Sequence, residues 1–314
     1  MRWNVEDIPD QTGRVAVITG ANGGLGLACA HVLADRGAHV LMAARNTTKA
    51  ERARDQILTD VPDASLDVVR LDLGDLASVE SAATTILATH PALDILINNA
   101  GVMATPETRT VDGFEQQVGI NHLGHFALTA RLLPALAKGT AARIVAVTST
   151  GRHAGRVLDP KDPFREGRYD PWRAYGDSKL ANLLFAVELD ARLRAAGSRI
   201  ASLVAHPGLS ATNLQASSVE ATDGGVSQRL FHGLARFTGM SPERGALPQL
   251  RAATDPQARG GALYTPRFVN GGSPVRRPIL PPSRSREQGQ QLWAVSEHQT
   301  GITFDVAELI ARDR

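Results

Sequence analysis

The sequence predicts an α/β fold with a doubly wound parallel sheet covered by helices on both faces. Short, continuously apolar segments alternate along the chain with segments whose apolar residues repeat at helical spacing. Strands that are apolar throughout and separated by helices are typical of parallel sheets buried between two helical layers. The segments that meet this description are residues 15–18, 40–42, 66–71, 95–97, 144–147 and 200–204.

We expect residues 1–314 to form one domain, because folds of this class often reach this length as a single unit. Three segments interrupt the alternation. Residues 152–172 and 209–250 are interpreted as insertions that cover a substrate, and residues 269–286, rich in Pro, Gly and Arg, are expected to be an irregular loop. Within the second insertion, apolar residues at helical spacing could form a face against a hydrophobic substrate or part of the core: Leu230, Phe231, Leu234 and Phe237.

Composition excludes several classes of protein. The net charge of +2 is too small to indicate a nucleic acid as the main partner. A single cysteine, Cys29, excludes a disulfide framework and suits a reducing compartment. Residues 1–10 contain no apolar run, and no segment approaches the roughly 20 apolar residues of a membrane span. We therefore expect a cytoplasmic protein without a signal peptide or a membrane anchor.

A glycine-rich loop, residues 19–26, follows the first predicted strand and precedes a predicted helix. In that position glycines allow a tight turn and bring the backbone close to a pyrophosphate at the helix N-terminus. The sequence therefore predicts a dinucleotide site rather than a plain turn. Residues expected to contact the cofactor here are Gly20, Asn22, Gly24, Leu25 and Gly26.

The end of the second predicted strand bears on the type of dinucleotide. An acidic residue at that point commonly binds the ribose 2′-hydroxyl of NAD. Here the strand ends in Arg45, whose guanidinium suits a 2′-phosphate by charge and geometry. We expect NADP(H) to be preferred, while NAD(H) stays open, since Arg45 could also be a solvated loop residue.

Candidate catalytic residues follow the fifth predicted strand. Tyr175 and Lys179 are spaced by four residues and would share one face of a helix. A nearby cation favours the phenolate and so lowers the pKa of a tyrosine from about 10 towards the working range. Ser149 ends the strand, at the carboxyl edge where ligands of open α/β sheets bind, and could hydrogen bond a substrate oxygen. Tyr169 is rejected as the catalyst because the residue four positions later is Arg173, which does not lose its proton.

Two further segments complete the set. Residues 98–101, Asn-Asn-Ala-Gly, follow the fourth strand, and their small side chains would let the backbone approach a cofactor. Asn121 precedes a helical run together with His122 and His125. The histidines show no cluster with a suitable third ligand, so that no metal is expected.

Taken together and in this order, these residues resemble the short-chain dehydrogenase/reductase family, and the similarity covers nearly the whole chain. Three features are most similar to the retinol dehydrogenase-like branch. They are the string Asn-His-Leu-Gly-His-Phe at 121–126, the spacing of 26 positions from Ser149 to Tyr175, and residues 292–296. That resemblance does not extend to the apolar leader of the membrane-bound retinol dehydrogenases, so we do not expect retinoid specificity. The matching positions are Thr19, Gly20, Gly24, Gly26, Asp72, Leu73, 98–101, Asn121, Ser149, Tyr175, Lys179, Pro207, Gly208 and Thr212.

The resemblance implies a Rossmann fold and NADP(H)-dependent interconversion of a carbonyl and an alcohol. Tyr175 would be the acid/base, Lys179 would bind the nicotinamide ribose and lower the tyrosine pKa, Ser149 would orient the substrate, and Asn121 would support a proton relay. The cofactor would also be contacted by Asp72 and Leu73 at the adenine, by Asn99, Ala100 and Gly101, and by Pro207, Gly208 and Thr212 at the nicotinamide end. Many relatives pair through helices such as the one after Tyr175, so a homo-oligomer is an open expectation.

Two other functions are alternatives to a carbonyl or alcohol oxidoreductase. A non-enzymatic NADP(H)-binding regulator would not need Tyr175, Lys179, Ser149 and Asn121 together. An epimerase or dehydratase on the same scaffold usually has a different glycine spacing from that of Gly20, Gly24 and Gly26. We therefore expect an enzyme acting on a small-molecule carbonyl or alcohol, with a hydrophobic substrate favoured. The sequence does not specify the identity of the substrate or the direction of the reaction.

Overall fold

The computed structural model of this chain describes residues 2–208, 240–268, 271–280 and 285–311. In these ranges the strands form a single sheet of eight, in the order β3-β2-β1-β4-β5-β6-β7-β8. All neighbouring strands are parallel except β7 and β8, which are antiparallel. The strands are β1 Val15–Thr19, β2 His39–Ala44, β3 Leu66–Arg70, β4 Ile95–Asn98, β5 Arg143–Val147, β6 Ala201–Ala205, β7 Leu263–Phe268 and β8 Gly271–Arg277.

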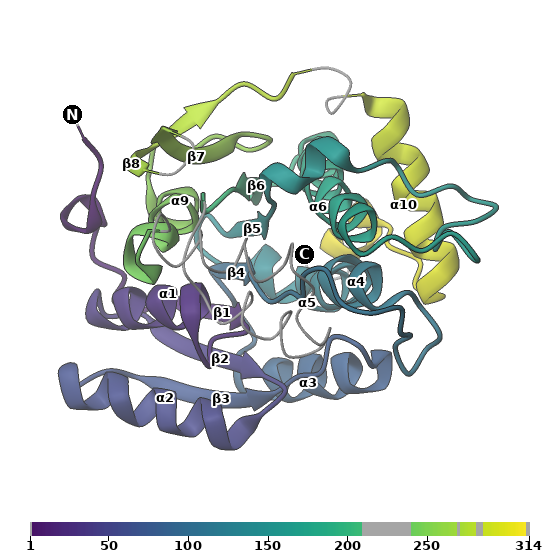
Figure 1. Cartoon of the computed structure of the whole chain (residues 1–314). Coiled ribbons are helices and arrows are strands. Elements are labelled where there is room, and N and C mark those ends of the chain that lie inside the picture. Colours follow the sequence, from purple (N-terminus) through teal and green to yellow (C-terminus); the bar gives the residue numbers. More distant parts are fainter. Residues whose placement is uncertain (1, 209–239, 269–270, 281–284, 312–314) are drawn as a thin grey trace.

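Helices cover both faces of the sheet (Figure 1). Helices α1, α2 and α9 pack on one face, and α3, α5 and α6 pack on the other, with α10 lying along α6. The longer helices are α1 Gly24–Asp35, α2 Thr47–Asp60, α3 Leu76–Thr89, α5 Gly124–Lys138, α6 Pro171–Ala195, α9 Pro242–Thr254 and α10 Arg286–Thr300. The shorter ones are α4 Gln116–Val118, α11 Val306–Ala311 and the 3₁₀ turns η1 Val5–Asp7 and η3 Thr150–Ala154.

The predicted fold class is confirmed. Each predicted strand is present, with ends that differ from the prediction by at most two residues. Strands β1, β2, β4, β5 and β6 are buried on both faces because their side chains meet two separate apolar cores, one under each helical layer. Tyr264 lies in β7 and is buried in the core on the α1 and α9 side.

The expected irregular loop at 269–286 is wrong in part. Residues Gly271–Arg277 form β8, which pairs with β7 at the edge of the sheet, and Arg286 begins α10. A strand rich in Gly and Pro lacks the apolar and β-branched residues by which strands are predicted from a sequence. Its Pro274 is tolerated because an edge strand does not need every backbone N–H for pairing.

The second expected insertion, 209–250, needs a similar correction. Residues 209–239, which include Leu230, Phe231, Leu234 and Phe237, lie outside the described residues. Residues Pro242–Thr254 form α9, where Ala246, Leu250 and Ala253 pack against α1 and the sheet. This part of the segment therefore belongs to the core and not to a substrate cover.

The first insertion, 152–172, is attached to α6 by one buried carboxylate. After η3 it contains little regular structure until α6 begins at Pro171. Asp177 accepts hydrogen bonds from Arg165 Nε at 2.6 Å and Nη2 at 3.1 Å, and from the Arg156 backbone N–H at 2.6 Å. A paired, buried carboxylate of this kind orients the loop relative to the helix.

The sheet order places a cleft at a defined point. Strands β1 and β4 are neighbours, but the chain leaves them towards opposite halves of the sheet. At such a switch point the loops that follow the strands diverge, and ligands bind in the gap at their carboxyl ends. No helix among the described residues is long and apolar enough to cross a membrane.

A stability prediction concerns Asp94, which precedes β4. Its carboxylate accepts hydrogen bonds from the backbone of Val15 at 2.9 Å and Thr140 at 2.8 Å, so that it connects β1 with the turn before β5. We expect Asp94→Ala to lower the free energy of unfolding by about 2–4 kcal/mol, because two backbone N–H groups lose their partner. Urea denaturation measures this. Asp55→Ala, which removes an exposed partner of Arg54, should change stability by less than about 0.5 kcal/mol, and an equal loss in both variants would contradict the prediction.

Candidate active site

A cleft of about 1120 Å³ lies at the carboxyl ends of β1, β2, β4, β5 and β6. Most of the residues expected from the sequence line it, although they come from widely separated parts of the chain. They are Gly20, Asn22, Gly24, Leu25, Arg45, Asp72, Leu73, Asn99, Ala100, Gly101, Ser149, Tyr175, Lys179, Pro207 and Gly208. Gly26 and Asn121 are not among the lining residues, and Thr212 lies outside the described part of the chain.

Gly26 lies in the first turn of α1 and packs closely against the glycine-rich loop. Helix α1 begins at Gly24, and Gly20 adopts a φ of +69°, a conformation that favours glycine. A Cβ on Gly26 would overlap the Gly20 carbonyl oxygen and lie 2.6 Å from Asn99 Nδ2. The missing side chain therefore lets α1 approach the two loops that follow β1 and β4.

One end of the cleft carries two exposed cations. Arg45 follows β2, and Lys49 lies in the first turn of α2, whose N-cap residue is Asn46. Within the described ranges neither cation takes part in an ion pair. The N-terminus of α2 adds a partial positive charge at the same place. This end of the cleft therefore suits an anionic group.

The other end of the cleft holds Ser149, Tyr175 and Lys179. Tyr175 and Lys179 lie on one side of α6, and the Ser149 hydroxyl at the end of β5 hydrogen bonds the Tyr175 phenol. Lys179 Nζ lies 5.8 Å from the centre of the Tyr175 ring and donates a hydrogen bond to the Val147 carbonyl at 3.3 Å. The Thr148 hydroxyl donates to the Lys179 carbonyl at 2.6 Å, which fixes α6 to the end of β5.

The pKa values of this group are governed by burial. Burial lowers the pKa of Lys179 to about 8, so that its ammonium is charged at neutral pH and loses the charge as pH rises through that value. Burial raises the pKa of Tyr175, and the hydrogen bond with Ser149 opposes the shift only in part. The pKa of Tyr175 is therefore raised overall, whereas the sequence predicted that Lys179 would lower it. The Lys179 ammonium is directed to the Val147 carbonyl. The phenol is therefore protonated at neutral pH.

Asn121 is fully buried behind the cleft. It lies in a π-helical turn, Gly119–Leu123, between α4 and α5. Its amide accepts a hydrogen bond from the Val102 N–H at 2.7 Å and donates to the Val102 carbonyl and the Ser178 hydroxyl, both at 2.9 Å. Single π-turns within helices are frequent at functional sites. Here the turn places Asn121 so that it joins the loop after β4 to α6, next to Lys179.

Comparisons with known proteins agree with this geometry. The family model for short chain dehydrogenases matches residues 14–223. This chain belongs to the short-chain dehydrogenase family. Human retinol dehydrogenase 12 is 37% identical over 93% of this chain and 88% of its own length, and mouse polyprenol dehydrogenase is 36% identical over 94% and 86%.

Solved structures are similar as well. A crystal structure of an uncharacterized protein from Mycobacterium paratuberculosis has a TM-score of 0.79 and 40% identity, covering 97% of this chain and 99% of that one. A structure described as an NAD(P)-dependent gluconate 5-dehydrogenase from Beutenbergia cavernae, with NADP bound, has a TM-score of 0.62 and 27% identity, covering 81% and 95%. The chain is thus a short-chain dehydrogenase of the retinol dehydrogenase-like branch, an oxidoreductase that interconverts carbonyls and alcohols with a nicotinamide dinucleotide.

His122 and Tyr169, which the sequence offered as alternative candidates, have structural roles in this dehydrogenase. His122 hydrogen bonds the Ser296 hydroxyl at 2.8 Å, and burial lowers its pKa to about 3. The Tyr169 hydroxyl donates to the Thr105 carbonyl at 2.8 Å and accepts from Gln117 Nε2 at 3.0 Å, and burial raises its pKa to about 12. Tyr169 therefore holds a loop of the cleft wall, consistent with its rejection as the catalyst.

Some lining residues were missed in the sequence. Lys49 is four residues after Arg45, and that spacing at a helix start could have indicated a second cation. The loop 102–108 and Trp172 carry no motif, and only the fold brings them to the cleft. Trp172 and Ala154 are the points at which the first insertion meets the cleft.

We expect Gly26→Ala to weaken cofactor binding by about tenfold or more, because the added methyl must displace the loop backbone that the sequence predicts to contact the dinucleotide. Titration of protein fluorescence with NADPH measures the affinity, and thermal denaturation shows whether the variant is folded. An unchanged affinity in a folded variant would contradict the close approach of α1 as the reason for this glycine.

Proposed function

We propose that this oxidoreductase prefers NADP(H) and uses Tyr175 as the proton donor and acceptor, with a hydrophobic carbonyl or alcohol as substrate. One observation carries the proposal: a single cleft has two exposed cations at one end and a lysine, a phenol and a serine hydroxyl at the other. A dinucleotide with a 2′-phosphate needs the first end, and hydride chemistry on a carbonyl needs the second.

The residues present fit such a cofactor. Glycines around the loop after β1 leave space for a pyrophosphate, and a Cβ on Gly101 would lie 2.9 Å from Asn121 Oδ1 and 3.3 Å from Lys179 Nζ. Arg45 and Lys49 would hold the 2′-phosphate, Asp72 and Leu73 the adenine end, and Lys179, Pro207 and Gly208 the nicotinamide end. The bound nicotinamide supplies or receives the hydride.

The protein's own residues handle the proton. In the reducing direction Tyr175 donates its phenolic proton to the substrate oxygen, and Ser149 donates a hydrogen bond to the same oxygen. The raised pKa of Tyr175 keeps the phenol in the protonated form that a reduction consumes. The Lys179 ammonium stabilises the phenolate that remains. Asn121 positions the loop after β4 and α6, and its part in a water relay stays a prediction.

A hydrophobic substrate is supported by the wall of the cleft beside Tyr175. Met103 packs against Tyr175, and Pro106 and Trp172 also line the cleft. The relatives named for retinol and polyprenol act on long apolar alcohols, which points in the same direction. Oligomeric state, cellular location and a contact of Thr212 with the cofactor stay predictions.

A turnover assay distinguishes the proposed enzyme from the alternative, a non-enzymatic NADP(H)-binding regulator. A panel of hydrophobic ketones, aldehydes and quinones is offered with NADPH, and its oxidation is followed by absorbance. Tight NADPH binding without turnover on any member would favour the regulator.

We expect Tyr175→Phe to lower kcat by about 10²- to 10⁴-fold, because the variant keeps the ring but has no proton to donate. Its NADPH affinity should stay within about twofold of the parent, since the ring still fills its place. Steady-state kinetics and a fluorescence titration measure the two quantities.

Tyr264→Phe is the matched control, because this buried tyrosine lies in the core away from the cleft. It should retain turnover. Full activity in Tyr175→Phe would reject the assignment of the acid/base.

We expect Arg45→Ala to weaken NADPH binding by about tenfold or more through the loss of a charge-assisted contact, and to leave NADH binding unchanged. Arg54→Ala in the following helix α2 is the control, since Arg54 pairs with Asp55 at 2.9 Å and does not line the cleft. The ratio of the two cofactor affinities is the readout. An equal effect on NADPH and NADH would show that Arg45 does not select the 2′-phosphate.

A further inference from the structure

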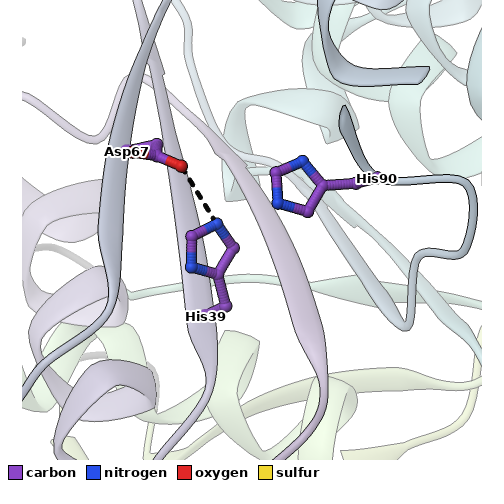
Figure 2. A group of neighbouring side chains, drawn as sticks. All are labelled: His39, Asp67 and His90. Carbon is purple, nitrogen blue, oxygen red and sulfur yellow. Dashed lines mark ion pairs between the residues drawn. The ribbon is translucent and has the colours of Figure 1, made fainter. Parts of the chain in front are cut away.

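The fold brings three metal-ligating side chains together, although none was expected from the spacing of the histidines. His39, Asp67 and His90 each offer one ligand atom, and these atoms all lie within 4.8 Å of one another (Figure 2). The residues are far apart in the sequence, so a search for short ligand motifs could not detect them.

Three different elements supply the group. His39 is the first residue of β2, and Asp67 lies in β3 opposite Leu41. Side chains alternate along a strand, so His39 and Leu41 share a face, and Asp67 lies beside them on that face. The same face is covered by α3, which ends at His90 as its C-cap residue. The ligands are therefore held by two paired strands and the end of a helix.

Hydrogen bonds leave one nitrogen of each histidine for another partner. His90 Nδ1 lies 2.8 Å from the Thr89 hydroxyl, which itself donates to carbonyls of α3. The hydroxyl must therefore accept from Nδ1–H, and Nε2 carries the lone pair. His39 Nδ1 lies 2.6 Å from the Ser65 hydroxyl. This pattern, with the second ring nitrogen held by a neighbour, is usual for metal-binding histidines.

The remaining nitrogen of His39 has an unusual environment. Nε2 is shielded from solvent and makes no hydrogen bond, although Asp67 Oδ2 lies 3.3 Å away. A buried nitrogen without a partner is costly. Two ligands at about 2.0–2.1 Å from a tetrahedral zinc ion lie about 3.3 Å apart, which matches the separation of these two atoms.

We propose that His39, Asp67 and His90 form a Zn²⁺ site at the amino-terminal edge of the sheet, with the fourth position open to water. Two imidazoles and a carboxylate are a ligand set that suits this ion. The C-terminus of α3 carries a partial negative charge that favours a cation. The Asp67 side chain is 62% exposed, which gives the ion a route from solvent.

Binding requires a local adjustment. The two imidazole rings are stacked, with centroids 4.8 Å apart and planes at 19°. Lone pairs in nearly parallel planes converge on one ion only if a ring turns, and His90, at the end of a helix and half-buried, has the freedom to do so. The bound ion would then join β2, β3 and α3.

The site is separate from the catalytic cleft. His39 begins β2, while Ala44 at its other end lines the cleft, so the two lie about 16 Å apart at the rise of a strand. We therefore assign the ion a stabilising role. Its presence does not depend on the identity of the substrate or on the cofactor.

The test is a Zn²⁺ titration of tag-free, full-length protein after dialysis against EDTA, in competition with a chromogenic chelator. We expect one site per chain and a rise in the melting temperature with added Zn²⁺, because binding to the folded state stabilises it. Asp67→Asn and His90→Ala should each weaken binding by at least about tenfold.

His31→Ala is the matched control. His31 pairs with Asp60 at 3.2 Å, but among the described residues no third ligand joins them. Its loss should leave Zn²⁺ affinity unchanged. NADPH binding should be the same in all variants, and circular dichroism establishes that they are folded. Absence of binding in the parent protein, or equal binding by the parent, Asp67→Asn and His90→Ala, would overturn the proposal.

Discussion

The hydroxyl of Thr19 holds together the two loops between which the cleft opens. It accepts hydrogen bonds from the backbone N–H groups of Asn99 at 2.9 Å and Ala100 at 3.0 Å, so that the chain after β1 is fixed to the chain after β4. His125 Nε2 lies 2.9 Å from the same oxygen, and its Nδ1 lies 2.9 Å from the Asn121 carbonyl. Burial lowers the pKa of His125 to about 4, so the ring is neutral and can accept from Thr19 while it donates to Asn121. The switch point of the sheet and the π-turn are thus one connected structure.

Charge is distributed in the cleft according to exposure. Arg45 and Lys49 are exposed and retain their hydration, so their cost to the fold is small. Lys179 is buried, and the cost of its charge is visible in the lowering of its pKa to about 8. The neighbouring Tyr175 stays protonated. A buried ammonium beside a neutral phenol is a suitable starting state for a reaction in which the phenol gives up its proton and the resulting negative charge meets a positive one.

Helix α6 presents Tyr175 and Lys179 on one side and holds the first insertion, residues 152–172, with another. Residues two positions apart on a helix point to opposite sides, so Asp177 is directed away from the side that carries Tyr175 and Lys179. It holds Arg165 and the backbone of Arg156, and thereby fixes the long segment between Ser149 and Tyr175 to the helix that carries Tyr175 and Lys179. The segment between Ser149 and Tyr175 is thus anchored at α6 itself.

Local patterns in the sequence were sufficient for the fold class, most of the strands and most of the cleft. Apolar strands and a glycine-rich turn act over a few residues, and parallel strands must bring their carboxyl ends to one edge, so Gly20, Ser149 and Tyr175 had to meet there. Other features depended on packing between distant segments. Edge pairing made β8 from a segment rich in Gly and Pro, burial raised the pKa of Tyr175, and the approach of α3 to β2 and β3 assembled His39, Asp67 and His90. Such features arise from contacts and desolvation in three dimensions, which leave no periodic signal along the chain.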